Sequence, residues 1–522
     1  MHNSFILFTI GSVQQFIEPS RKLKDLYVGS YLLSHLAIKT KNFFENNNAT
    51  IIIPTSPTDA PNRLVVSCAS EKALVLAKEA ENVIQQELIT IGKAVIEYTQ
   101  ENFTVEMEEQ LKSFLDIHWV IEQEQGDFQT TYKNLLQQMH RIKHTRTFVQ
   151  INEKAARKCD LYEQYNGLFK QHSSLKENET LSAIAFIKRN FDRWFKSENK
   201  EPLLNVSSVA YMLLKSYLPQ KAERSLLELK DEHSELLFNL KYQKTALVVD
   251  ENIHQLYEEY GEYIGSPYYA IVKLDGDGIG TKYQEVNTMQ QAKGLSRAIS
   301  DFSKKAKKMI EEQEGICIFA GGEDILAFLP IHQIFQVLPA LIKEFGQIKE
   351  LNSKGTLSAG IIISHFMTPL KPLLKEVERL ESYAKAIDDE KAAFSMSIIK
   401  RSGLTTPIRM KFGEDCQNFN LLKKLVDALQ QQQNSNSFVH KLIATLSEIK
   451  DVITEDMLTL LIRKQLKNSV VEEQLVEQQV STFISIYRQV NKEMDVFLQL
   501  LEQSTFLART MWEEKQEVNV NV

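Results

Sequence analysis

The ten residues "FAGGEDILAF" (319–328) place two glycines and two acids between two short apolar runs. Apolar runs joined by Gly-Gly-Glu-Asp predict two β-strands in a hairpin. The turn needs its glycines, because glycine adopts a positive φ without steric strain. It does not need Glu323 and Asp324, whose like charges stand side by side at the expected tip. The two acids therefore indicate a function beyond the turn.

The segments around this hairpin complete a β-α-β-β-α-β order, because their apolar residues recur at strand or helix spacing. The predicted elements are a strand at 268–274, a helix at 287–313, the hairpin strands at 316–320 and 325–329, a helix at 331–345 and a strand at 356–365. This order is the split βαβ of ferredoxin-like domains. The fold hosts many unrelated functions, so it does not by itself indicate a chemistry.

The N-terminal part of the chain repeats the same order less clearly. Its predicted elements are a strand at 5–10, a helical region that includes 25–44, strands at 49–54 and 62–69, a helix at 71–100 and a strand at 114–123. Its first strand runs into "TIGSVQQ" without an acid, and its hairpin loop, "TSPTDAPN" (55–62), has only Asp59. We therefore expect this copy to lack the chemistry of the second.

Helical periodicity dominates the rest of the chain, as in "LSAIAFIKRNFDRWF" (181–195), and the Gln-rich stretch at 428–437 is an expected loop. We predict an α+β protein with two ferredoxin-like palm or cyclase-type domains. The predicted domains are a degenerate ferredoxin-like domain at 1–130, a helical middle domain at 131–261, an active ferredoxin-like domain at 262–411 and a helical C-terminal domain at 412–522.

The composition, 43% apolar and 25% charged residues, is ordinary for a globular protein. No apolar run approaches the roughly 18 residues that span a bilayer. The N-terminus lacks the basic leader and cleavage site of a signal peptide. The four cysteines form no CxxC pair, which disfavours a cysteine zinc site and fits a reducing cytoplasm. We expect no association with membranes.

The net charge of −7 disfavours a free-standing nucleic-acid binder. One local exception is "MHRIKHTR" (139–146). This stretch is either a solvated helix face or a nucleic-acid-binding stripe made of His140, Arg141, Lys143, His144 and Arg146.

Four acids fall at one edge of the second predicted sheet. The strand at 268–274 runs directly into "DGDGIG" (275–280), and the first and third strands of a ferredoxin-like sheet are neighbours. Carboxylates that lie so close together raise one another's pKa unless cations neutralise them. Oxygen ligands of this kind suit Mg²⁺ or Mn²⁺. Two such ions about 4 Å apart would hold the attacking and leaving oxygens of a phosphoryl displacement. The expected metal ligands are Asp275, Asp277, Glu323 and Asp324.

The glycines of the two loops would let a triphosphate approach the backbone closely: Gly276, Gly278, Gly321 and Gly322. Each loop alone is also compatible with a simple turn. "DGDG" is similar to a calcium loop as well, but Ile279 and Val286 would then occupy ligand positions, and a strand rather than a helix precedes it. The joint occurrence of both loops at adjacent positions of one fold favours the nucleotide site.

These motifs resemble those of the CRISPR polymerases, the large subunits of type III effector complexes, and more remotely those of the GGDEF cyclases. The likeness begins with "LDGDGIG" (274–280) and "FAGGEDILAF". Further segments look like the type III-B (Cmr) large subunit: "TIGSVQQFIEPSRKLKDLYVGSYLLSHL" (9–36), "PNRLV" (61–65), "LSAIAFIKRNF" (181–191), "LSAGIIISHFMTPLKPLLKEVERLESYAKAID" (357–388) and "IIKRSG" (398–403). The likeness is colinear from residue 1 to about residue 410.

The resemblance implies a cytoplasmic subunit of an antiviral complex, with the other Cmr subunits, CRISPR RNA and target RNA as partners. Target RNA would switch on nucleotidyl transfer, in which a ribose hydroxyl attacks the α-phosphate of ATP and releases pyrophosphate. The product would be a cyclic oligoadenylate, or, as in some relatives, a conjugate of AMP with S-adenosylmethionine.

By the same analogy, Asp275 and Asp324 are the first candidates for catalytic metal ligands, and Glu323 and Asp277 the second. Lys385, in "YAKAID", matches the triphosphate-binding lysine of GGDEF-type relatives, and Lys391 is an alternative. Both lysines are equally compatible with an exposed helix surface.

Three features depart from the family pattern. Relatives commonly have Gly-Gly-Asp-Asp where this chain has Gly-Gly-Glu-Asp. Many carry an N-terminal HD nuclease domain, for which we expect no room before the strand at Phe5, and hence no DNA cleavage. The family's zinc knuckle would need a cysteine at Tyr162, beside Cys159, so we expect that zinc site to be lost.

Two other functions stay open. A catalytically inactive scaffold that binds guide and target RNA would have the same fold, although the four retained acids favour the enzyme. A free diguanylate-type cyclase is disfavoured by the degenerate first copy and the large helical domains.

Overall fold

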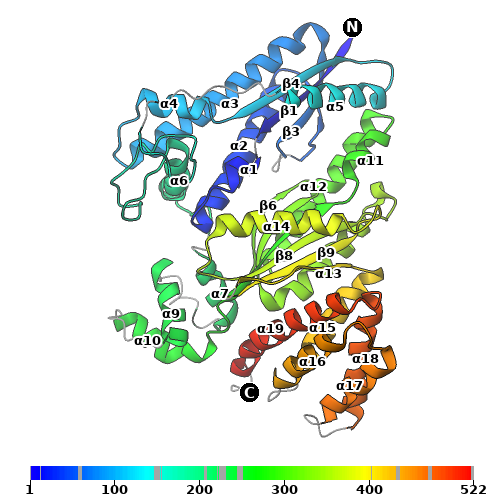
Figure 1. The fold of residues 1–522 in the computed structure, drawn as a ribbon. Helices are drawn as coiled ribbons and strands as arrows, with labels where there is room; N and C mark the ends of the chain where they lie inside the picture. Colours follow the sequence, from blue (N-terminus) through cyan, green and yellow to red (C-terminus); the bar gives the residue numbers. More distant parts are fainter. Residues whose placement is uncertain are drawn as a thin grey trace.

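The computed structural model describes residues 2–11, 13–56, 61–145, 153, 156–204, 208–219, 222, 231–243, 251–400, 403–430, 436–467 and 473–518. Two α/β units form the centre of this part of the chain, and Figure 1 shows the N-terminal unit (blue) above the second unit (green to yellow). The C-terminal helices (orange to red) lie below the second unit in the same view.

The first unit is a four-stranded antiparallel sheet in the order β2-β3-β1-β4. Its elements are β1 (Asn3–Gly11), α1 (Val13–Ile17), α2 (Leu23–Asn46), β2 (Thr50–Ile53), β3 (Arg63–Ala69), α3 (Ser70–Tyr98), α4 (Val105–Lys112), β4 (Asp116–Gln123) and α5 (Phe128–His144). The alternate residues Ile6 and Phe8 pack with α2 and α3, whereas Phe5 and Leu7 pack with α5. Because both faces are covered, β1 is a continuous apolar run rather than an alternating one.

The second unit is a seven-stranded sheet whose central order, β8-β5-β7-β6, repeats that of the first. Its elements are β5 (Tyr268–Gly276), α11 (Ile279–Glu285), α12 (Met289–Glu311), β6 (Ile316–Gly321), β7 (Asp324–Pro330), α13 (Ile334–Gly346), β8 (Leu357–His365), α14 (Leu370–Lys385), β9 (Ala393–Lys400), β10 (Gly403–Leu404) and β11 (Ile408–Lys411). The strand β9 runs parallel to β8 after the crossover through α14 and extends the sheet beyond the four predicted strands.

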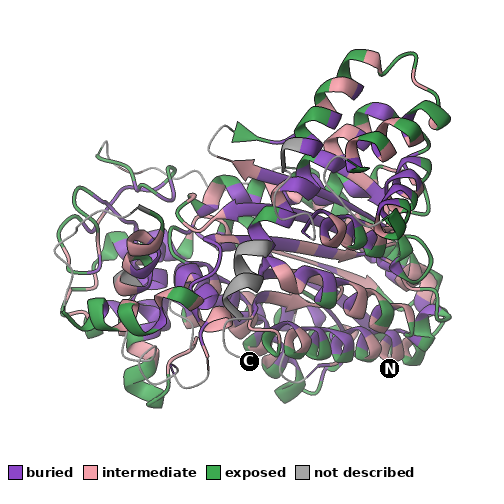
Figure 2. Cartoon of the chain, turned by 90° about the horizontal axis from the view of Figure 1, so that it is seen from below, coloured by how far each residue is buried: buried purple, intermediate pink, exposed green. Residues whose placement is uncertain are grey.

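The helices of the second unit cover both faces of its sheet. The apolar side of α14 packs with Ile271 and Phe328 in the same core as the first unit, so the two sheets share one hydrophobic cluster. The opposite face packs on α12, α13 and the C-terminal helices. Figure 2 shows the resulting pattern, with buried strands between helices whose outer surfaces are exposed.

The remaining described helices flank these units. The middle region contributes α6 (Ala183–Asn199), α7 (Val209–Tyr217), α9 (Asp231–Gln243) and α10 (Glu251–Tyr260), and the C-terminal region α15 (Gln417–Gln430), α16 (Asn436–Ile449), α17 (Glu455–Lys467), α18 (Glu473–Gln489) and α19 (Met494–Val518). The helix α6 packs on α2 and α3 of the first unit. Among the helices described, none is both long and apolar enough to cross a membrane.

The predicted α+β class with two ferredoxin-like units is confirmed by the two sheet orders. The domain boundaries stay predictions. The helix α5 begins just before residue 130, where we placed the end of the first domain, and it packs on the first sheet.

The contact between β8 and α14 depends on Gly360. A Cβ atom at this position would meet two backbone atoms of α14, the carbonyl oxygen of Val377 and the amide nitrogen of Glu381. Backbone atoms cannot rotate away as a side chain does, so any larger residue has to displace the helix.

We expect Gly360→Ala to lower the free energy of unfolding by about 1–3 kcal/mol, the usual cost of overpacking a core. The matched control is Gly294→Ala, because Gly294 lies within α12 and a Cβ there meets nothing within 4 Å. The control should raise stability by up to about 1 kcal/mol through helix propensity. Urea unfolding of both variants tests the contact, and equal stability of Gly360→Ala and the parent would contradict it.

Candidate active site

Two of the predicted acids meet at the end of the central strands of the second sheet. The antiparallel register of β5 and β7 pairs Leu274 with Ile325, so Asp275 and Asp324 follow on adjacent strands. Their carboxyl groups are hydrogen-bonded to each other. The strand order thus brings together two acids that are 49 positions apart in the sequence (324 − 275).

The pKa values of the two carboxyl groups shift in opposite directions. Burial, the hydrogen bond to Asp275 and the charge of that residue raise the pKa of Asp324 well above its usual range. Burial also acts to raise the pKa of Asp275, but the hydrogen bonds from Asp324 and Lys385 outweigh it, and the pKa of Asp275 is lowered. Of the two carboxyl groups, Asp275 therefore loses its proton at the lower pH and Asp324 at the higher pH.

Lys385 supplies the positive charge beside this pair. It is the last residue of α14, and its ammonium group forms ion pairs with Asp275 and, at 2.8 Å, with Glu381. Burial alone would lower the pKa of Lys385, but its bonds to Asp275 and Glu381 raise it, so the side chain stays charged. Lys385 thus lies beside the two acids, and its triphosphate-binding role, which the resemblance implied, stays a prediction.

Glu323 lies next to the pair in the hairpin turn. Gly322 has a φ of +73°, which only glycine adopts readily, and it allows the two-residue turn between Gly321 and Asp324. A Cβ on Gly276 would lie 2.7 Å from the Cβ of Glu323, so Gly276 lets the turn approach the end of β5. The pKa of Glu323 is raised overall. Burial is the largest cause, a hydrogen bond from its own backbone lowers the pKa in part, and the charge of Asp275 raises it further.

The predicted convergence of four carboxylates is not what the structure shows. The carboxylate of Asp277 accepts hydrogen bonds from the Ser358 hydroxyl at 2.9 Å and the Ala392 amide at 3.1 Å, on the β8 side of Asp275. Asp324 begins β7, which lies on the opposite side of β5 from β8, so these bonds hold the Asp277 carboxylate away from Asp324. The main-chain amide of Lys391 bonds Asp388, and no contact links its side chain to the acids in the described part of the chain.

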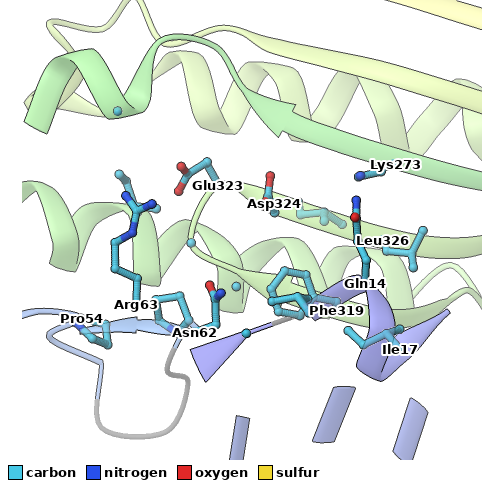
Figure 3. A pocket seen from close by; sticks show the side chains of 18 of the residues that line it. Gln14, Ile17, Pro54, Asn62, Arg63, Lys273, Phe319, Glu323, Asp324 and Leu326 are labelled. Atoms are coloured by element: carbon cyan, nitrogen blue, oxygen red, sulfur yellow. The ribbon is translucent and has the colours of Figure 1, made fainter. Parts of the chain in front are cut away.

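A cavity of about 680 Å³ lies between the two units, in front of Asp324 and Glu323. Gly321, Gly322 and Gly280 line it, whereas the predicted Gly276 and Gly278 do not. Figure 3 shows Glu323 and Asp324 on one side of this cavity, with Arg63 and Asn62 facing them from the first unit. Both units therefore contribute to the cavity.

Three cations that no sequence motif assigned to this place line the same cavity: Arg63, Lys143 and Lys273. Arg63, at the start of β3, lowers the pKa of Glu323 by its charge. Lys143 comes from "MHRIKHTR", so this stretch is not one uniform surface stripe; His140 and His144 instead contact each other at 2.9 Å on the exposed side of α5. Asp59 and Arg146 lie outside the described residues.

A second pair of carboxyl groups, those of Glu18 and Glu378, lines the cavity where α1 meets α14. Gln14 donates a hydrogen bond to Glu378 at 2.7 Å, and Lys273 donates to the same oxygen at 2.9 Å. Burial and the neighbouring Glu378 raise the pKa of Glu18 to about 7. In the sequence, Gln14 and Glu18 stand out only because they belong to the segment 9–36, which resembles the family. That resemblance does not indicate which residues they contact.

The donor chemistry of Asp275 and Asp324 fits a divalent cation. The Lys385 ammonium group forms an ion pair with Asp275, and Asp324 lies beside it, so the two carboxyl groups form a site that attracts positive charge. Within the described ranges, however, no three His, Cys, Asp or Glu side chains are grouped closely enough to hold a metal ion together. Substrate phosphates and water would have to complete the coordination, as is usual for Mg²⁺.

Two family profiles match the chain. The profile described as "Cas10/Cmr2, second palm domain" matches residues 268–394, and "CRISPR-associated protein Cmr2, N-terminal" matches residues 5–112. The chain is 24% identical to the CRISPR system Cmr subunit Cmr2 of Pyrococcus furiosus over 535 aligned positions. This match covers 75% of the chain and 61% of the relative's length.

Two solved complexes contain chains of similar fold. In the type III-B Cmr-beta complex, one chain matches with a TM-score of 0.66 in the apo state and 0.62 with cognate target RNA bound, at 12% identity. The apo match covers 90% of this chain and 78% of that one. A chain of the Csm1-Csm4 cassette in complex with cA4 matches with a TM-score of 0.50 and 12% identity, over 97% of this chain and 70% of that one.

We expect Glu18→Gln to stabilise the protein at pH 8 and to change its stability little at pH 5. The folded state raises the pKa of Glu18 from 4.5 to about 7, so it binds one more proton than the unfolded chain between these values. Stability of the parent therefore falls as the pH rises through 7. Glutamine stays neutral, keeps a donor toward Glu378 and removes that loss. The midpoint of urea unfolding in metal-free buffer measures the effect.

Glu448→Gln, on the exposed surface of α16, is the matched control and should follow the parent at both pH values. A Glu18→Gln variant that is no more stable than the parent at pH 8 would show that the folded protein does not raise the pKa of Glu18.

Proposed function

The chain belongs to the Cas10/Cmr2 family, and from that premise we propose that it is a nucleotidyltransferase that uses ATP to make an adenylate second messenger. The observation that carries the proposal is the Asp275–Asp324 pair: Asp275 is bonded to Lys385, and Asp324 lines a cavity that Arg63, Lys143 and Lys273 also line. Carboxylates that attract cations, beside cations that attract phosphates, suit a nucleoside triphosphate with its metal ion.

Each side of the cavity has a distinct task in this proposal. Asp275 and Asp324 would hold Mg²⁺ or Mn²⁺, which neutralises charge on the reacting phosphates when bound. Lys385 then becomes free to contact the triphosphate. Arg63 and Lys143, on the first unit, would bind phosphate oxygens from the opposite side, and Gly321 and Gly322 leave room for the nucleotide at the hairpin tip.

The reaction is attack of a ribose hydroxyl oxygen on the α-phosphorus of ATP. The new P–O bond replaces the bond to the β-phosphate, pyrophosphate leaves, and the hydroxyl proton passes to solvent. The acceptor is a second ATP in the route to a cyclic oligoadenylate. In the alternative product, AMP is joined to S-adenosylmethionine, which then takes the place of the second ATP as acceptor.

The partners proposed for this chain are the other Cmr subunits, a CRISPR RNA and a target RNA. Support comes from the relatives, since one solved structure of similar fold is a Cmr-beta complex bound to cognate target RNA, and another is a Csm1-Csm4 cassette in complex with cA4. Pairing with the target is the task of the guide RNA, and the protein would sense backbone geometry.

We expect Asp324→Ala, and equally Asp275→Ala, to reduce product formation at least about 100-fold, because either change removes one of two adjacent cation ligands. The assay incubates the assembled complex with target RNA, Mg²⁺ or Mn²⁺ and labelled ATP, with and without S-adenosylmethionine, and EDTA should abolish the product. In the metal-free protein, Asp324→Ala removes a buried carboxyl group together with its hydrogen bond to Asp275, so we expect stability to change by no more than about 1–3 kcal/mol.

Asp301→Ala, an exposed acid on α12, is the control and should keep parental activity. Normal yield from Asp324→Ala would contradict the site. No product from the parent in any condition would leave a scaffold that binds guide and target RNA, and a product that requires S-adenosylmethionine would identify the conjugate.

A second variant tests the contribution of the first unit. We expect Arg63→Gln to raise KM for ATP about tenfold, with a smaller change in kcat, because one charge-assisted hydrogen bond to phosphate contributes about 1.5–3 kcal/mol. Arg297→Gln, on the exposed face of α12, is the matched control. An unchanged KM for Arg63→Gln would mean that the first unit does not bind the phosphates.

A further inference from the structure

The motif "LSAIAFIKRNF" on α6 carries two consecutive cations in the interior of the protein. Lys188 is 2% exposed and Arg189 is 8% exposed. Arg189 is paired, because its guanidinium group bonds both carboxylate oxygens of Asp25 at 3.0 and 2.9 Å and Glu179 at 3.2 Å. Lys188 faces only neutral acceptors, so its position requires a separate explanation.

All five hydrogen-bond acceptors of the Lys188 ammonium group belong to neutral groups in the described chain. It donates to the Phe16 carbonyl at 2.8 Å, the Pro19 carbonyl at 3.1 Å and the Ser20 hydroxyl at 2.9 Å. The weaker contacts are the Ile17 carbonyl at 3.4 Å and the Tyr162 hydroxyl at 3.2 Å. The group therefore grips the end of α1 and the turn that follows it.

The two hydroxyl groups complete this arrangement. The Ser20 hydroxyl donates to the Ile17 carbonyl at 2.7 Å, and the Tyr162 hydroxyl donates to the Phe16 carbonyl at 3.2 Å. Each hydroxyl thus uses its proton on α1 and accepts from Lys188 with a lone pair. The final carbonyls of a helix lack partners within the helix and attract a cation, which accounts for the choice of lysine.

The anchor is costly to maintain, which argues for a role beyond filling space. Burial lowers the pKa of Lys188 to about 7, and a buried ammonium group needs all its acceptors to stay charged. Gly29 adds to the fit, since a Cβ on it would meet the Phe16 carbonyl oxygen at 3.0 Å and the Lys188 Cε at 3.2 Å. A glycine inside α2 weakens that helix, but here it lets α1 and Lys188 approach.

What Lys188 holds in place is one wall of the cavity. Within α1 and its C-terminal turn, Gln14, Ile17 and Glu18 all line that wall. Gln14 bonds Glu378 of α14, the helix that ends in Lys385. The contacts thus run from α6 through α1 to α14 without a gap.

We propose that Lys188 is a positioning residue, which fixes α1 at the depth where Gln14 meets Glu378 and so links the middle region to the nucleotide cavity. The predicted effect on the nucleotide rests on the proposed function, whereas the anchoring of α1 does not.

The test uses Lys188→Met in the full chain. Hydrogen exchange of residues 13–20 should become at least about tenfold faster, because the carbonyls lose their donor. In the assembled complex, Lys188→Met and Gln14→Ala should each raise KM for ATP several-fold, and the double variant should be no worse than the more impaired single one. Two effects that multiply would mean that Lys188 does not act through Gln14, and the proposal would fail.

Lys196→Met, an exposed lysine on the same helix, is the control and should leave both measurements unchanged. If Lys188→Met does not fold, Tyr162→Phe removes one hydroxyl at constant shape and should give a smaller change of the same kind. Unchanged exchange at 13–20 in a folded Lys188→Met or Tyr162→Phe variant overturns the anchor. Faster exchange in a complex whose parent makes no product supports the anchor and refutes the proposed function separately.

Discussion

The antiparallel register of β5 and β7 is the constraint on which the rest of the site depends. It places Asp275 and Asp324 on adjacent strands at the same sheet end, where two ionised carboxylates would repel each other. In the structure the two carboxyl groups are hydrogen-bonded to each other, and the ammonium group of Lys385 pairs with Asp275. The position of α14 follows from the same need, because its last residue has to reach Asp275, and Gly360 lets the helix lie close enough to the sheet.

Much of this centre was predictable from the sequence. Strand order alone brings Asp275, near the end of β5, beside Asp324, which begins β7, and both glycine-rich loops are visible as motifs. The direction of Asp277 was not predictable, because it is set by Ser358 and by Ala392, which are more than 80 positions away. The extension of the sheet by β9 was missed for a related reason: a parallel strand after a crossover helix has no hairpin signal next to it.

The cavity shows a different limit of sequence analysis. Arg63 and Lys143 belong to the degenerate first unit, where the absence of acids suggested a loss of chemistry. In the structure this unit instead contributes cations opposite the acids of the second unit. Cations of one unit that face acids of the other have no pattern within either repeat, and the arrangement becomes visible only when the shared core fixes how the two units face each other.

Glu323 lies between the Asp275–Asp324 pair and the cavity that the two units share. Relatives commonly have aspartate at this place, and a simple expectation is that the longer side chain shifts a metal ligand. In the structure the Asp275–Asp324 pair forms without Glu323, whose Cβ rests above Gly276 while its charge is influenced by Arg63 of the other unit. The extra methylene therefore carries a carboxylate toward the cavity rather than toward the pair. A change at this position would alter the charge on the cavity wall, and it would leave in place the two acids that the strand register holds together.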